Sequence, residues 1–126
     1  MSDLVLELPP VPGSVPRARA ALDALLDVVG PERLDDLRLV VSELVTNSVR
    51  HAGLGTKDSI DLRVESGPKV IRVEIHDPGP GFDAPTLPTS MYQESGWGLY
   101  LVSRIADRWG VSSKDDGTTV WLEISR

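Results

Sequence analysis

Two polar residues of a predicted helix, Glu43 and Asn47, could together bind a metal-phosphate group. They are four residues apart, so on a helix they project from neighbouring positions of one face. The asparagine offers a hard carbonyl oxygen to Mg²⁺, and the glutamate can act as a general base. At about 100° per residue, the pair lies nearly opposite the apolar stripe of the same helix. From this helix alone, a solvated polar face is the simpler interpretation.

A second candidate motif consists of Asp77, Gly79 and Gly81, at the end of a predicted buried strand. Asp, Pro and Gly are the usual turn residues, so a turn explains most of the motif. A turn does not explain why an acidic residue emerges from an apolar strand. A carboxylate at this place can accept a hydrogen bond from an adenine amino group, and glycines let the backbone approach the ring closely. The motif alone leaves both interpretations open.

Two further motifs carry glycine at the start of a predicted element. The stretch GWGL at positions 96–99 comes directly before a helix, and helix N-termini with flanking glycines bind phosphates through free backbone N–H groups. A flexible joint at the start of a helix explains this stretch equally well. Gly117 and Thr118 open the last strand, where β-branched residues are common. Since side chains alternate along a strand, only one of Thr118 and Thr119 can face a given side.

Apolar periodicity predicts the elements that position these motifs. Residues 4–8 alternate weakly and end at two prolines, which indicates a short edge strand. Ser14 is the predicted N-cap of a first helix that ends at Gly30. A second helix begins near Pro31 and ends at one of the glycines at 53 and 55. Its apolar face consists of Leu34, Leu37, Val41, Leu44, Val45, Ser48 and Ala52.

The second half of the chain combines short strands with a long loop and a helix. Residues 60–64 and 70–75 alternate on either side of a Ser-Gly-Pro turn, which predicts a hairpin. Residues 77–98 are rich in Pro, Gly and Ser without periodicity, and a loop of this length is usually functional or disordered. A helical pattern follows at 99–106, and two last strands flank a turn at 115–117. This order predicts an α+β fold, a two-layer sandwich in which a mixed, mostly antiparallel β-sheet carries helices on one face.

Length and composition set the broad class of protein. A chain of 126 residues fits one domain, so we expect residues 1–126 to fold together. Its 13 Lys and Arg against 19 Asp and Glu give a net charge of −6, which argues against general binding to nucleic acids or anionic membranes. The absence of cysteine excludes disulfides and suits a cytoplasmic protein. The sequence carries neither a secretory signal pattern nor the roughly 20 apolar residues of a membrane span.

The combination of the four motifs is far more specific than any one of them. In order, and on the elements that each role requires, they resemble the GHKL ATPase domain, also called the Bergerat fold. The matching positions are Glu43 and Asn47 in the N box, Asp77, Gly79 and Gly81 in the G1 box, and Gly96 and Gly98 in the G2 box. The stretches SELVTNSVRHA and GWGLYLVSRIADRWGV look most like the bacterial anti-sigma-factor serine-kinase branch of that superfamily.

The resemblance implies an adenine-binding end of the site. Asp77 would accept a hydrogen bond from the adenine amino group, and Thr118 would support it, with a water between them. Gly79 and Gly81 would shape the adenine pocket.

The resemblance also implies a phosphate-binding end. Asn47 would hold Mg²⁺, and Glu43 would activate the attacking hydroxyl or water. Gly96, Gly98 and the neighbouring Leu99 would contact phosphate at the hinge of a mobile lid over about residues 80–97. Arg50 occupies a position where related histidine kinases often carry a basic residue that reaches phosphate, whereas His51 receives no role.

These roles imply an enzyme that uses ATP and Mg²⁺. It would transfer the γ-phosphate to a serine of an anti-anti-sigma (STAS-type) antagonist protein and sequester a sigma factor, as a homodimer in the cytoplasm. One departure favours an alternative: no Lys or Arg lies between Arg72 and Arg104, and Ser95 stands where many relatives carry an arginine. Since phosphoryl transfer rests on positioning and charge neutralisation, a non-catalytic ATP-binding regulatory module is the second hypothesis. A histidine kinase is less well supported, because no phosphoacceptor hairpin precedes the domain.

Overall fold

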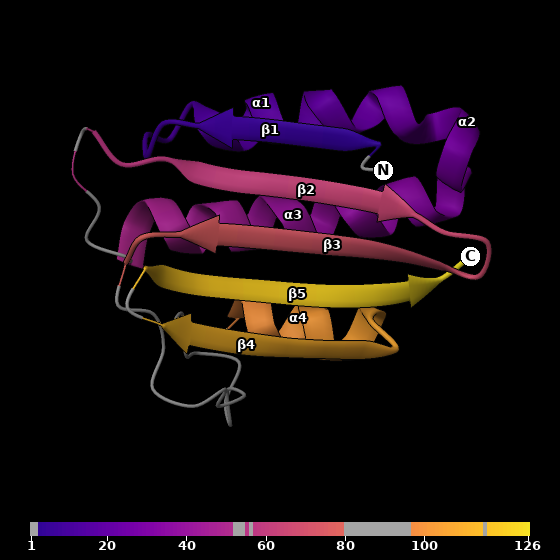
Figure 1. Ribbon diagram of the computed structural model, residues 1–126. Helices are drawn as coiled ribbons and strands as arrows, with labels where there is room; N and C mark the ends of the chain where they lie inside the picture. Colours follow the sequence, from indigo (N-terminus) through magenta and orange to yellow (C-terminus); the bar gives the residue numbers. More distant parts are fainter. Residues whose placement is uncertain (1–2, 52–54, 56, 80–96, 115) are drawn as a thin grey trace.

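The computed structural model describes residues 3–51, 55, 57–79, 97–114 and 116–126. Figure 1 shows one five-stranded β-sheet with the helices packed on one of its faces. The elements in chain order are β1 (Leu4–Leu8), α1 (Ser14–Leu22), the short 3-10 helix η1 (Asp23–Leu25), α2 (Leu26–Val29), α3 (Pro31–His51), β2 (Ile60–Ser66), β3 (Val70–Asp77), α4 (Trp97–Ile105), β4 (Arg108–Lys114) and β5 (Gly117–Ser125).

The strands lie in the order β1-β2-β3-β5-β4, and each neighbouring pair is antiparallel. The α+β class, the edge position of β1 and the hairpin of β2 and β3 are therefore confirmed. The sequence predicts a mixed, mostly antiparallel sheet, whereas all four strand pairs of the described residues are antiparallel. The crossover through α4 does bring β4 parallel to β3. Because β5 lies between these two strands, they do not pair with each other.

Alternate residues of each strand face the helices and form the core. In β5, for example, Leu122 and Ile124 are buried, while Trp121 and Glu123 point to the opposite face of the sheet. The predicted apolar stripe of α3 is confirmed for all its described members, which are Leu34, Leu37, Val41, Leu44, Val45 and Ser48; Ala52 lies outside the described residues. Burial of each large aliphatic side chain contributes roughly 1.5–3 kcal/mol, so α3 is held firmly against the sheet.

The first helix differs from its prediction in two ways. Ser14 is buried beside the end of β1, so its hydroxyl donates backward to the carbonyl oxygen of Pro9 at 2.5 Å, and Gly13 is the N-cap instead. The helix is also interrupted by η1. A 3-10 turn superimposes residues three apart, which places both Leu22 and Leu25 in the core.

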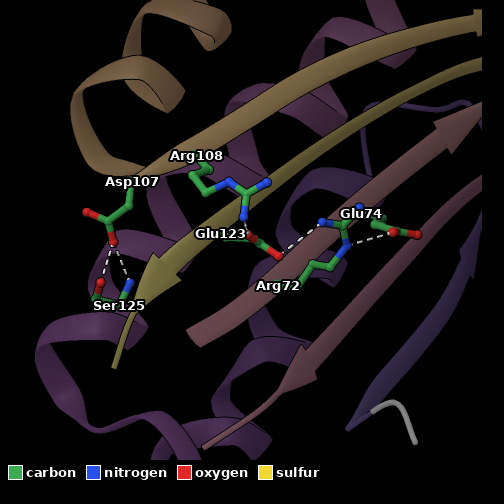
Figure 2. Close-up of polar contacts among 6 residues, drawn as sticks. All are labelled: Arg72, Glu74, Asp107, Arg108, Glu123 and Ser125. Carbon is green, nitrogen blue, oxygen red and sulfur yellow. Dashed lines mark hydrogen bonds and ion pairs between the residues drawn. The ribbon is translucent and has the colours of Figure 1, made fainter. Parts of the chain in front are cut away.

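The C-terminal end of β5 is tied to several other elements. The Asp107 carboxylate accepts hydrogen bonds from the backbone N–H and the hydroxyl of Ser125, at 2.7 and 2.6 Å (Figure 2). Arg33, in the first turns of α3, donates to the carbonyl oxygen of Ser125 at 2.7 Å. Arg126 donates to the carbonyl oxygens of Gly67 and Val28. Within the described part of the chain, none of the helices is both long enough and apolar enough to span a bilayer.

Candidate functional site

Three of the predicted site residues, Asp77, Gly79 and Thr118, meet at one end of the sheet. Asp77 is the last residue of β3, and the register pairs it with Thr118 at the beginning of β5. The C-terminal half of α3, which carries Asn47 and Ser48, packs over the same end of β3 (Figure 1). Segments that are far apart in the sequence therefore converge on Asp77.

The carboxylate of Asp77 is buried and held from two sides. Its residue is 8% exposed. Its Oδ2 atom accepts a hydrogen bond from the hydroxyl of Ser48 at 2.7 Å, and its Oδ1 atom accepts one from the backbone N–H of Gly79 at 2.8 Å. Hydrogen bonds to a carboxylate are stronger than neutral ones and offset the cost of burying the charge. Among the described residues each oxygen accepts one such bond, and a carboxylate oxygen can accept a further one.

Thr118 supports Asp77 through the turn that follows β3. Its hydroxyl donates to the carbonyl oxygen of Gly79 at 3.1 Å, and its residue is 3% exposed. Gly79 in turn donates to Asp77. Thr118 therefore holds Gly79 in place, and Gly79 holds the carboxylate of Asp77. Thr119 points to the other face, where its hydroxyl lies 2.9 Å from Nδ1 of His76. Of the two threonines, only Thr118 thus faces the site, as strand alternation requires.

Gly117 is a residue that the sequence analysis did not assign to the site. Its φ angle is +132°, a backbone conformation that favours glycine. A Cβ atom at this position would lie 2.0 Å from the carbonyl oxygen of Asp77 and 2.7 Å from Cα of Pro78. Glycine is therefore required for β5 to begin this close to the end of β3. The Gly-Thr pair at the start of the strand was the signal that could have identified it.

The α3 residues form the second part of the site. Glu43 and Asn47 lie one turn apart on α3 and are both partly buried. The sequence analysis places them nearly opposite the apolar stripe, and the structure corrects this for Asn47. Its Nδ2 atom is buried and has no hydrogen-bond partner among the described residues. The reason is that α3 contacts α1, α4 and β3, so it buries a wider surface than the apolar residues alone indicate.

A buried amide N–H group without a partner is costly unless an acceptor, such as a water or a ligand oxygen, meets it. Nδ2 of Asn47 is such a donor, so a metal contact would fall to the side-chain oxygen of this residue and not to the unpaired nitrogen. The side-chain oxygen of Asn47 suits Mg²⁺, which commonly takes one or two protein ligands and completes its shell with phosphate oxygens and waters. The described residues hold no group of three His, Cys, Asp or Glu side chains that could bind a metal by themselves. The donor set thus fits a metal that arrives with a phosphorylated ligand. Arg50, one turn beyond Asn47, is exposed.

The glycine motif before α4 is described only in part. The helix begins at Trp97, so Gly98 and the backbone of Leu99 lie within its first turn, whereas the periodicity of the sequence predicts a start at Leu99. Gly81, Gly96 and nearly all of the predicted lid lie outside the described residues. The structure therefore joins Asp77, Gly79 and Thr118 to α3 through Ser48, the neighbour of Asn47, and most of the predicted phosphate-binding loop lies outside the described residues.

Comparison with known proteins identifies the family of the chain. The chain matches the histidine kinase-like ATPase domain over residues 8–124 and belongs to that family of ATPases. Within the family it is 30% identical over 118 residues to the serine-protein kinase RsbW of Listeria innocua, a match that covers 82% of this chain and 75% of that protein. It is 32% identical over 117 residues to the anti-sigma F factor of Clostridium botulinum, with 84% and 82% covered.

Two solved structures have the same fold. The crystal structure of the RsbU and RsbW domains of Rv1364c from Mycobacterium tuberculosis superimposes with a TM-score of 0.73 at 22% identity. That match covers 98% of this chain and 32% of the other, so this chain corresponds to about a third of it. The histidine kinase domain of a blue-light activated kinase from Erythrobacter litoralis gives a TM-score of 0.60 at 21% identity, covering 92% of this chain and 60% of that one.

Proposed function

We propose that this chain is an ATP-binding serine protein kinase of the anti-sigma-factor type. It would transfer the γ-phosphate of ATP to a serine of an anti-anti-sigma (STAS-type) antagonist and would also sequester a sigma factor. The observation that carries the proposal is the Asp77 carboxylate held by Ser48 and Gly79, together with the buried Nδ2 atom of Asn47, which has no hydrogen-bond partner among the described residues, in a chain of the ATPase family. The names of its relatives, serine-protein kinase and anti-sigma factor, support the choice of reaction and partners.

The adenine ring would bind at the β3–β5 end of the site. Asp77 would accept a hydrogen bond from the adenine amino group, since both of its oxygens keep a free acceptor position. Gly79, held by Thr118, and Gly81 would line the pocket without side chains that exclude the ring.

The phosphates would extend from there toward α3 and the start of α4. Asn47 would hold Mg²⁺, which would neutralise the negative charge of the phosphates. Gly96, Gly98 and Leu99 would offer backbone N–H groups to phosphate, and Arg50 would supply a cation. Glu43 would remove the proton from the attacking serine hydroxyl of the antagonist, as a general base.

The second candidate function is a non-catalytic ATP-binding regulatory module. It is favoured by the sequence between Arg72 and Arg104, which contains no Lys or Arg to neutralise the γ-phosphate. We infer a cytoplasmic protein, because the sigma factor that the proposed kinase would sequester acts there. We also infer a homodimer, without direct nucleic-acid or membrane binding, in keeping with the net charge of −6.

The nucleotide site is tested by calorimetric titration with ATP and ADP, with and without Mg²⁺. Asp77→Asn should weaken ATP binding about tenfold to a hundredfold, because it changes a charge-assisted hydrogen bond. Asn47→Ala should remove the Mg²⁺ dependence. Asp61→Asn, an exposed aspartate of β2, is the matched control and should bind as wild type does. A wild-type chain that binds no nucleotide at millimolar concentration would contradict both candidate functions.

Phosphotransfer to the antagonist then separates the two functions. Glu43→Gln should still bind ATP and should lower the transfer rate about a hundredfold or more, the usual loss on removing a general base. Glu32→Gln, on an exposed position of the same helix, is its control. Tight ATP binding without transfer to any cognate antagonist would favour the regulatory module.

A further inference from the structure

Ser48 is the one residue of the predicted apolar face of α3 that carries a hydroxyl, and that hydroxyl contacts the site. It is 6% exposed and donates to Oδ2 of Asp77, a residue 29 positions later in the chain, at 2.7 Å. Sequence patterning treats Ser48 only as a small core residue. The bond is buried, so water competes poorly for either partner.

The two donors to Asp77 come from different elements and fix different oxygens. Gly79 holds Oδ1 from the turn after β3, and Ser48 holds Oδ2 from α3. A carboxylate with one donor can rotate about its last torsion, which is broad for aspartate. With both donors in place, the plane of the carboxylate and its two free acceptor positions are set before a ligand arrives.

We infer that Ser48 is a positioning residue that makes Asp77 selective for a purine with a 6-amino group, and that it thereby sets the preference for ATP. This inference rests on the proposed adenine contact of Asp77. A purine that carries an oxygen at position 6 would place one hydrogen-bond acceptor against another, the carboxylate of Asp77. A purine that carries hydrogen at position 6 would leave the carboxylate oxygen without a hydrogen-bond donor. A binding site that hydrogen-bonds a particular group of its substrate discriminates against an analogue that lacks this group. The discrimination is strongest when the protein group that makes the bond, here the carboxylate of Asp77, is held in one orientation.

The position of Ser48 in α3 gives the bond a second consequence. It directly follows Asn47, the proposed magnesium ligand, on the same helix. The bond from Ser48 to Asp77 therefore ties the adenine end of the site to the phosphate end. A bound nucleotide must satisfy both ends at once, so a fixed distance between them contributes to affinity as well as to selectivity.

The experiment measures the affinities of ATP and of purine riboside triphosphate, which lacks the 6-amino group, by calorimetry with Mg²⁺. Wild type should prefer ATP. Ser48→Ala should lower that preference about tenfold, the effect of losing one hydrogen bond to a charged group. Ser48→Cys, which keeps the side-chain size and a weak donor, should give an intermediate preference. Ser42→Ala is the matched control: this serine lies on the same helix and its hydroxyl donates to the carbonyl oxygen of Arg38, so the preference should not change.

The outcomes separate this inference from the function on which it rests. If wild type binds the two nucleotides equally, the proposed adenine contact of Asp77 is wrong. If wild type prefers ATP and Ser48→Ala keeps that preference, Ser48 is not a positioning residue. An equal loss of affinity for both nucleotides would assign Ser48 a purely structural role and would also overturn the inference. Ser48→Cys carries the same comparison if Ser48→Ala does not fold, as thermal unfolding reports.

Discussion

At the scale of single residues, the site depends on contacts that sequence spacing does not reveal. The motif of Asp77, Gly79 and Thr118 was visible in the sequence because each lies where a strand ends or begins. The bond from Ser48 was not, since it joins positions 29 apart, and only the packing of α3 on β3 creates it. The burial of the Asn47 amide was missed for the same reason. A helical wheel assigns faces to a helix but does not say which neighbours cover them.

Gly117→Ala should destabilise the protein by roughly 2–4 kcal/mol, from the strained backbone and the overlap with the carbonyl of Asp77. It should also weaken ATP binding, because relief of the overlap must move Asp77. Gly13→Ala is the control: its φ is −62°, and an added Cβ would meet no atom within 4 Å. Urea unfolding and ATP titration of both variants test this, and equal stabilities for the two would contradict it.

At the scale of elements, the sequence predicted the five strands and the helical segments in order, because alternation and helical periodicity are properties of local segments, but it did not predict that η1 interrupts the first helix. It did not predict that β5 would insert between β3 and β4, since strand order depends on long-range pairing. It also did not predict how β3, β4 and β5 are joined on the sheet face turned away from the helices. There, Glu123 of β5 lies 3.2 Å from Arg72 and 3.4 Å from Arg108, on the two neighbouring strands (Figure 2).

This cluster is built around one indole ring. The guanidinium groups of Arg72 and Arg108 lie 4.6 and 6.0 Å from the ring centroid of Trp121, and the ring covers Gly110, where a Cβ would lie 2.7 Å from Nε1 of Trp121. Burial would lower the pKa of Arg72, but hydrogen bonds to Glu74 and Glu123 outweigh it, and the pKa is raised. Arg72 therefore remains charged and available to both carboxylates.

Glu123→Gln should lower the free energy of unfolding by roughly 1 kcal/mol at low salt, because two partly exposed ion pairs lose their shared carboxylate. The loss should shrink in molar salt, which screens such pairs. Glu7→Gln, at an exposed position of β1, is the control and should change little. Urea unfolding at two salt concentrations measures this, and a loss that does not depend on salt would assign the effect to packing of the side chain.

At the scale of the whole molecule, the two ends of the sheet are stabilised by different sets of hydrogen bonds. The candidate site lies at the end where β3 finishes and β5 begins, while the other end is fastened by the C-terminal residues of the chain. Asp107, between α4 and β4, accepts both donors of Ser125, and Arg33 of α3 donates to the same residue. These hydrogen bonds to Ser125 thus join the sheet to the helix layer at the end remote from the site.

The contact between Asp107 and Ser125 predicts how the stability of the folded protein depends on pH. The hydroxyl and then the backbone N–H of Ser125 stabilise the charged form of Asp107 and lower its pKa from the ordinary value of 3.8. A carboxyl whose pKa is lower in the folded state adds stability above its unfolded pKa, and that stability is lost as pH falls through the folded pKa. Asp107→Asn should therefore unfold at a lower temperature than wild type at pH 7, and the difference in unfolding temperature should become smaller below about pH 4.

Asp27→Asn, at an exposed position of α2, is the control, and its unfolding temperature should not approach that of wild type in this way as the pH falls. Thermal unfolding from pH 7 to pH 2.5 tests this. A constant difference across that range would mean that Asp107 acts through the shape of its side chain and not through its charge.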